Sequence, residues 1–235
     1  MNYYYTIKAD IHASTQNKKY QDLSKLVMHV NEDLDGEYSK DDTLIKLMIR
    51  SGDELFGIYR DPKLFLEVYE RLVTEAKTYK IPLYIGLGYG LIDKVTRDEH
   101  LVNGPSIWQA TKALESIGKG IGKYDEKLNA NIQVKVLFTD IETSNKVYQT
   151  LFYVFSEKIL KRTKEQSISV KLIKKYPNKS YPELYDLIDP NTVSNQDDSE
   201  NKRIKFTKYL QRAEYHLVND MANVIAYNLE RLVTL

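Results

Sequence analysis

The order of apolar segments in the first 160 residues constrains the fold more than any other feature of this chain. Strand-like patterns cover residues 3–10, 44–49, 55–59, 83–92 and 132–138, and helical spacing covers 18–34, 61–80, 105–117 and 139–161. The second and third strands flank a Gly-Asp turn, which is typical of a hairpin. A hairpin inside this order indicates the split βαβ arrangement. We therefore predict an α+β fold with a ferredoxin-like or palm-type antiparallel sheet and helices on one face.

The apolar pattern is interrupted near residues 160–165, at Lys161-Arg162-Thr163-Lys164. We predict a domain boundary there, with a palm domain in residues 1–160 and a small helical domain in residues 161–235. Short helices are expected at about 165–175 and 182–188. A long helical pattern then runs from Lys202 to the end of the chain.

Composition excludes some chemistry and leaves other chemistry open. The 235 residues include 34 basic and 33 acidic side chains, so the overall charge does not point to nucleic acid. The chain has no cysteine, which excludes disulfides, thiol catalysis and thiolate metal sites. No apolar run is long enough to span a bilayer, and no secretory leader is recognisable. We therefore expect a cytoplasmic protein without a membrane partner.

Two aspartates form the first candidate site. Asp10 ends the first predicted strand and Asp53 lies in the tip of the hairpin. In a split βαβ sheet the first strand lies beside the hairpin, so both carboxylates can face one point, with the Ile11 carbonyl as a further ligand. Two neighbouring carboxylates repel each other unless a cation lies between them, and Mg²⁺ prefers such oxygen ligands. Alternatively, these are ordinary turn and strand-end aspartates.

Four segments carry a resemblance to a known family. Lys8-Ala9-Asp10-Ile11 and Ser51-Gly52-Asp53-Glu54-Leu55-Phe56-Gly57, followed by residues 85–92 and 104–115, are similar to the SatD family of bacterial proteins. The match covers roughly the first 120 residues. In the tail, residues 209–215 resemble the helix-turn-helix of that family, with more divergence.

The same segments more distantly resemble class III nucleotide cyclases and the diguanylate cyclase (GGDEF) palm. This resemblance implies that Asp10, Ile11 and Asp53 hold Mg²⁺ or Mn²⁺, that a nucleoside triphosphate is the ligand, and that the protein is a homodimer. Gly52 would leave room for a phosphate beside the turn. The neighbours Glu54 and His12 are further candidates for nucleotide binding, although a lone loop histidine is more often a solvent-facing residue.

The helix after Gly104 departs from the cyclase pattern. Active class III cyclases carry an asparagine and an arginine there, and this chain has Trp108 and Lys112. Lys112 supplies a charge without the guanidinium fork, and is the single candidate catalytic residue; a solvated surface charge is the alternative. For Trp108 we expect packing in the core or at a dimer interface. The substitutions favour a nucleotide sensor over an active nucleotidyl cyclase or transferase, with a non-catalytic homodimeric scaffold as a third possibility.

The tail has a local cluster of basic residues that is suited to contact with DNA phosphates. We predict DNA binding through one helix that carries Lys202, Arg203, Lys205, Lys208 and Arg212. The alternatives are the charged face of an ordinary amphipathic helix and a dimerising helical tail. In the first hypothesis, nucleotide binding to the palm domain is coupled to DNA binding by this tail.

Overall fold

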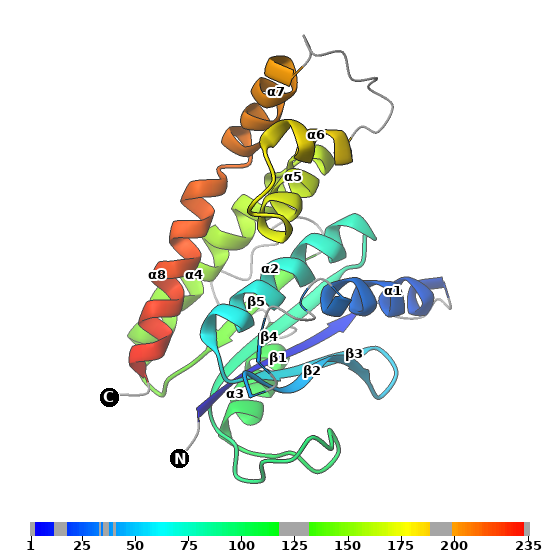
Figure 1. Cartoon of the computed structure of the whole chain (residues 1–235). Coiled ribbons are helices and arrows are strands. Elements are labelled where there is room, and N and C mark those ends of the chain that lie inside the picture. The colour runs from blue at the N-terminus through cyan, green and yellow to red at the C-terminus, as the bar shows by residue number, and fades with distance from the viewer. Residues whose placement is uncertain are drawn as a thin grey trace.

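The computed structural model describes residues 3–11, 18–32, 34, 38–39, 41–117, 132–188 and 199–232. Its centre is a five-stranded sheet in the order β2-β3-β1-β4-β5 (Figure 1). The strands are β1 (Tyr3–Ile11), β2 (Thr43–Arg50), β3 (Glu54–Tyr59), β4 (Leu83–Leu91) and β5 (Ile132–Leu137). The predicted α+β class and the central hairpin of β2 and β3 are confirmed.

The sheet is mixed, so the prediction of an antiparallel sheet is wrong for its last strand. β1 pairs antiparallel with both β3 and β4, but β5 pairs parallel with β4. Between β4 and β5 the chain passes through α3 (Pro105–Ile117), which packs against both strands. Such a crossover returns the chain to its starting direction, which makes the two strands parallel.

Helices cover both faces of the sheet, so the prediction of helices on one face is also wrong. α1 (Lys18–Glu32) and α2 (Pro62–Thr78) share a core with Tyr5, Ile7 and Ala9 of β1. The alternate β1 residues Thr6 and Lys8 face α3 instead, where Thr6 Oγ1 lies 2.7 Å from Ser106 Oγ.

Glycines in β4 explain why α3 lies so close to the sheet. A Cβ on Gly88 would come within 2.3 Å of the Ala110 nitrogen and the Ser106 oxygen, and one on Gly86 within 2.3 Å of the Ala110 oxygen. Only strand residues without a side chain allow this helix backbone to approach. These two glycines therefore accommodate the protein's own helix.

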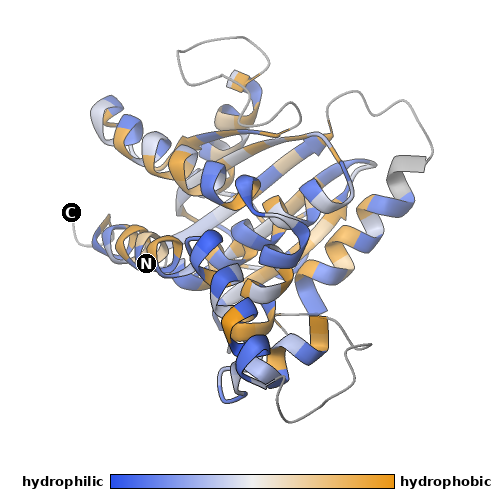
Figure 2. Cartoon of the chain, turned by 90° about the horizontal axis from the view of Figure 1, so that it is seen from above, coloured by the Kyte–Doolittle hydropathy of each residue, from blue (hydrophilic) through white to orange (hydrophobic). Residues whose placement is uncertain are grey.

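The remaining helices form two groups. α4 (Glu142–Lys161) and α8 (Tyr215–Arg231) join the core beneath α2 through Phe152, Val218, Ile225 and Leu229. α5 (Lys164–Lys175), α6 (Tyr181–Ile188) and α7 (Ser199–Arg212) enclose a separate cluster. It is built from Val170, Leu184, Tyr185, Phe206, Leu210 and Ala213. Figure 2 shows that the helices of the chain carry both hydrophobic and hydrophilic residues along their length, as expected for amphipathic helices.

The long C-terminal helical pattern is two helices. α7 ends at Arg212 and α8 begins at Tyr215, with Glu214 between them at a left-handed φ of 51°. α8 then runs back along α4 (Figure 1). The division at residue 160 stays a prediction, but α8 contributes to the core of the first 160 residues. Among the described residues, none of the helices has both the length and the apolarity needed to cross a membrane.

Candidate metal and nucleotide site

The structure brings the two predicted aspartates to one edge of the sheet. The β1–β3 register pairs Ala9 with Leu55. Extended by one residue, this antiparallel register brings Asp10 to Glu54, next to the hairpin turn. Asp53 lies in that turn, which closes through positive φ angles at Ser51 (50°) and Gly52 (89°). The side chain of Asp10 is exposed at the end of β1 and follows the face that carries Lys8.

The charges at this edge favour a cation. Although the Asp10 side chain is exposed, its carboxyl has lost part of its solvent contact, which raises the pKa of Asp10, and the negative charge of Asp53 raises that pKa further. Glu54 adds to this effect, while a backbone hydrogen bond at Ile11 and the charge of Lys8 oppose it. Two carboxylates that repel each other in this way are stabilised by a bound cation.

A divalent cation at this edge would have to take only part of its ligands from the protein. Within the described residues no group of three or more histidine, aspartate or glutamate side chains is arranged to hold a metal. Asp10 and Asp53 would therefore supply two carboxylates, and phosphates or water would complete the shell, as Mg²⁺ commonly requires. The side chain of Ile11 is buried in the core, and its role as a carbonyl ligand stays a prediction.

Glu54 is held by two basic residues that the sequence reasoning missed. Lys8 Nζ lies 2.9 Å from Glu54 Oε2, and Arg50 Nε and Nη2 each lie 2.9 Å from Glu54 Oε1. Lys8 is almost fully buried and also donates to Thr111 Oγ1 of α3 over 3.2 Å. These pairs largely neutralise Glu54. A nucleotide could contact Glu54 only by displacing Lys8 or Arg50. Glu54 is therefore better explained as the residue that positions these two side chains.

A sequence signal for these two residues did exist. Lys8 is two residues from Asp10 and so shares its strand face, and Arg50 directly precedes the turn that carries Asp53. A lysine and an arginine beside a carboxylate pair are suitable partners for phosphate oxygens.

The helix residues that were compared with the cyclase pattern lie on the exposed side of α3. Trp108 is 49% exposed, and its Nε1 donates to Asn103 Oδ1 over 2.8 Å. The prediction that Trp108 packs in the core is wrong, because the buried side of α3 is formed by other residues: Ser106, Ile107, Ala110, Ala113 and Ile117. Packing of Trp108 at a dimer interface stays a prediction. Lys112 is exposed, one position after the Thr111 that Lys8 contacts.

The other two predicted nucleotide-binding residues are Gly52, which the structure describes, and His12, which it does not. Gly52 has no atom within 4 Å of the point where a Cβ would lie, so the space beside the turn is open. His12 lies outside the described residues.

The predicted DNA-binding residues all lie on α7, but not on one face. Lys202 is buried beside Phe206 and Leu210, and its Nζ lies 2.7 Å from Asp186 Oδ1. This removes Lys202 from any surface that could contact DNA. The other four, Arg203, Lys205, Lys208 and Arg212, are exposed.

The exposed members of this set differ in their local partners. Arg203 binds Glu200 through two contacts of 2.6 and 2.8 Å, and the Lys205 ammonium lies 5.5 Å from the Tyr185 ring centroid. Lys205, Lys208 and Arg212 follow a spacing of three and four residues, which places them on one helix face. DNA binding by this face stays a prediction.

Neither a scan of protein-family models nor a search of curated protein sequences found a match to this chain, so the geometry of the site carries the functional argument.

Proposed function

We propose that this protein binds a nucleotide together with Mg²⁺ or Mn²⁺ at Asp10 and Asp53, as a cyclase-like nucleotide sensor. The observation that carries the proposal is the β1–β3 register, which brings Asp10 at the end of β1 to the β2–β3 turn that holds Asp53. A divalent cation between them would relieve their repulsion and would bind the phosphates of a nucleoside triphosphate.

The surrounding residues are consistent with binding of phosphate. Lys8 and Arg50 lie on Glu54 next to the carboxylate pair, and the turn at Gly52 is open to solvent. Charged donors of this kind form strong hydrogen bonds to phosphate oxygens, which here would replace part of their contact with Glu54. The metal, when bound, would supply charge neutralisation for those phosphates.

The residues at positions 108 and 112 of α3 favour a sensor over an active cyclase. Trp108 uses its indole nitrogen to bind Asn103, and Lys112 is the one candidate for stabilising transition-state charge. A lysine is a point charge and lacks the paired donors of arginine. An active nucleotidyl cyclase or transferase is the second candidate, and it uses the same two aspartates.

In the full proposal a homodimer passes the state of the nucleotide site to DNA bound by α7. The exposed Lys205, Lys208 and Arg212 would contact phosphates. α7 leads through Glu214 into α8, which packs on the same core as α2, so the tail and the sheet are physically connected.

Calorimetry with each nucleoside triphosphate, with and without Mg²⁺ or Mn²⁺, tests the nucleotide site. Wild type is expected to show a binding component for one of them that appears only with metal, and Asp53→Ala is expected to lose that metal-dependent component. Asp41→Ala is the matched control, because Asp41 is an exposed aspartate just before β2. Metal-dependent binding that survives unchanged in Asp53→Ala would overturn the proposed site.

Product analysis and a gel shift separate the remaining alternatives. Mass spectrometry of the same mixtures would show a cyclic or linked nucleotide if the protein is an enzyme, and unchanged substrate if it is a sensor. A random DNA duplex at low salt tests the tail, because non-specific binding is strongest there. The absence of a shift, or a shift unchanged by alanine at Lys205, Lys208 and Arg212, would refute DNA binding by α7.

A further inference from the structure

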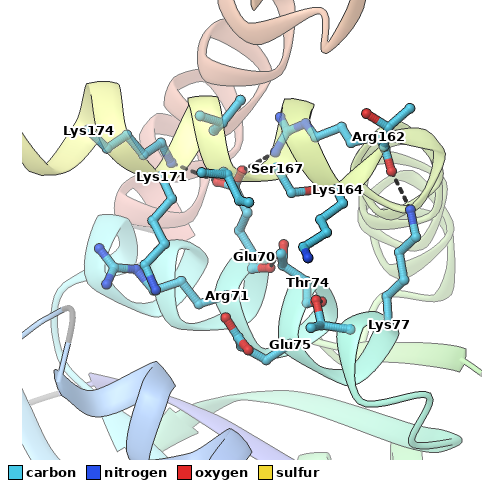
Figure 3. Close-up of a pocket in the computed structure, with 14 residues that line it drawn as sticks. Glu70, Arg71, Thr74, Glu75, Lys77, Arg162, Lys164, Ser167, Lys171 and Lys174 are labelled. Carbon is cyan, nitrogen blue, oxygen red and sulfur yellow. Dashed lines mark hydrogen bonds and ion pairs between the residues drawn. The ribbon is translucent and has the colours of Figure 1, made fainter. Parts of the chain in front are cut away.

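A cavity of about 440 Å³ lies between α2 and α5, outside the site described above (Figure 3). Its walls are the stretch from Glu70 to Thr78 of α2 and the stretch from Arg162 to Lys174. None of its lining residues belongs to the Asp10–Asp53 site, and α2 covers the sheet face opposite to α3. The volume is within the range of small-molecule sites in proteins.

The cavity is strongly basic. Six cationic side chains line it against two carboxylates, Glu70 and Glu75; the cations are Arg71, Lys77, Arg162, Lys164, Lys171 and Lys174. Arg71 is also paired over 2.9 Å with Glu67, just outside the lining, so the excess is about three positive charges. A concave surface with one sign of charge concentrates ligands of the opposite sign. In a chain with an overall charge of +1, this local excess is a property of the site and not of the composition.

Two of these cations, Lys77 and Lys164, form no ion pair with a carboxylate of the described residues. Lys77 Nζ donates to the backbone oxygens of Leu160, over 2.8 Å, and of Arg162. Burial and the nearby Arg162 lower the pKa of Lys77, which is the expected response of an ammonium that lacks a counter-charge. Lys164 is exposed at the first turn of α5 and forms no ion pair with any other described residue.

Arg162 supplies a buried donor that is only partly satisfied. It is 3% exposed, and its Nη1 lies 2.7 Å from Glu70 Oε1. Its Nη2 is buried and has no hydrogen-bond partner among the residues that the structure describes. Leaving such a donor without a partner is unfavourable. Arg162 lines the cavity, so a ligand oxygen that reaches Nη2 would remove that penalty.

The remaining lining provides hydroxyls and carbon surface. Thr74 of α2 and Ser167 of α5 lie on opposite walls (Figure 3). Ile168 and the aliphatic stems of the lysines supply apolar contacts. A purely inorganic anion would leave this apolar surface uncovered. A ligand with an anionic end and an organic body uses both parts of the lining.

We infer that the cavity between α2 and α5 is a second ligand site, for an organic phosphate of about nucleotide size, that needs no metal ion. The phosphate lies against Lys77, Arg162 and Lys164, and the organic body lies along Thr74 and Ile168. Because the two walls come from α2 and α5, the bound ligand joins the sheet region to the helices that precede α7. This inference is independent of the proposed function, which requires metal and different residues.

Calorimetry with ADP in EDTA tests the inference, because EDTA removes the metal that the Asp10–Asp53 site requires. Wild type is expected to bind ADP under these conditions. Lys164→Glu is expected to weaken binding by about tenfold or more, since a charge-assisted contact contributes at least that much. Ser167→Tyr, which places a ring in the cavity, is expected to block binding.

Three controls make the test specific. Lys179→Glu makes the same charge change outside the cavity, at an exposed position, and is expected to bind ADP like wild type. Asp53→Ala is also expected to bind normally in EDTA. Inorganic pyrophosphate is expected to bind more weakly than ADP but with the same dependence on Lys164.

Two results would overturn the inference. One is the absence of binding of both ADP and pyrophosphate to wild type in EDTA. The other is binding that is lost in Asp53→Ala and unchanged in Lys164→Glu and Ser167→Tyr, which would assign the ligand to the edge of the sheet. Thermal unfolding and circular dichroism of each variant establish that it is folded before its binding is compared.

Discussion

Replacing Glu70 by glutamine is expected to destabilise this protein strongly, because Glu70 is the counter-ion of a buried arginine. Its two oxygens lie 2.7 Å from Arg162 Nη1 and 2.7 Å from Lys174 Nζ, and the side chains of Glu70 and Arg162 are 8% and 3% exposed. Glutamine keeps the shape but removes the charge. Removal of one partner from a buried ion pair typically costs about 3–5 kcal/mol.

The pKa of Glu70 gives an independent magnitude. Burial alone would raise this pKa, but the charges of Lys174 and Arg162 and their hydrogen bonds lower it from 4.5 to about 2. That difference corresponds to about 3 kcal/mol of stability at pH 7. The contribution is complete above pH 4.5, the unfolded value, and is lost as the pH falls through the folded value near 2. At pH 3 it should be about 1.4 kcal/mol.

Urea unfolding at pH 7, 5 and 3, followed by circular dichroism, measures this effect. Glu70→Gln should lose about 3 kcal/mol at pH 7 and pH 5, and less than about half of that at pH 3. Glu142→Gln is the control, because Glu142 forms an exposed pair with Lys146 on α4 and its loss should not be measurable. A loss at pH 7 below about 1 kcal/mol, typical of an exposed pair, or one that does not shrink at pH 3, would refute the reasoning.

Two further substitutions test the packing. Gly88→Ala should destabilise the fold more than Gly52→Ala. The new Cβ at position 88 would lie 2.3 Å from backbone atoms of α3, while position 52 borders open space and adds only the strain of its φ of 89°. Equal losses of stability in a thermal melt would argue against the close approach of α3. Leu229→Ala should cost about 2–5 kcal/mol, because Leu229 is fully buried in the core that α8 shares with α2 and α4. A loss under about 1 kcal/mol, or a separate unfolding transition of the tail, would show that α8 does not stabilise that core.

The types of elements follow from local sequence signals. α3 begins at Pro105 and ends at Ile117, as its spacing predicts, and α2 starts after the N-cap Asp61, whose Oδ1 accepts from the Leu64 nitrogen over 2.7 Å. Capping, proline at the first helical position and apolar periodicity act within one or two helical turns, so they are legible without any tertiary contact.

The direction of β5 and the position of α3 could not be predicted from such local signals. An alternating segment such as Ile132–Leu137 pairs equally well in either direction, and its partner is chosen by the crossover that precedes it. Gly86 and Gly88 allow a close approach, but the backbone that approaches them comes from α3, about twenty positions later in the chain.

For the candidate site, too, the sequence predicted some features and the tertiary structure decided others. The sequence by itself placed Asp10 at a strand end and Asp53 in a hairpin turn, because strand and turn patterns are local. Only the tertiary structure decided that Lys8 and Arg50 hold Glu54, that Lys202 is buried, and that Trp108 is exposed. Glu70 and Arg162 are 92 residues apart in the chain yet share a buried hydrogen bond beside the basic cavity. Such contacts depend on how helices pack against each other, and no local pattern of residues encodes which distant charge a side chain will meet.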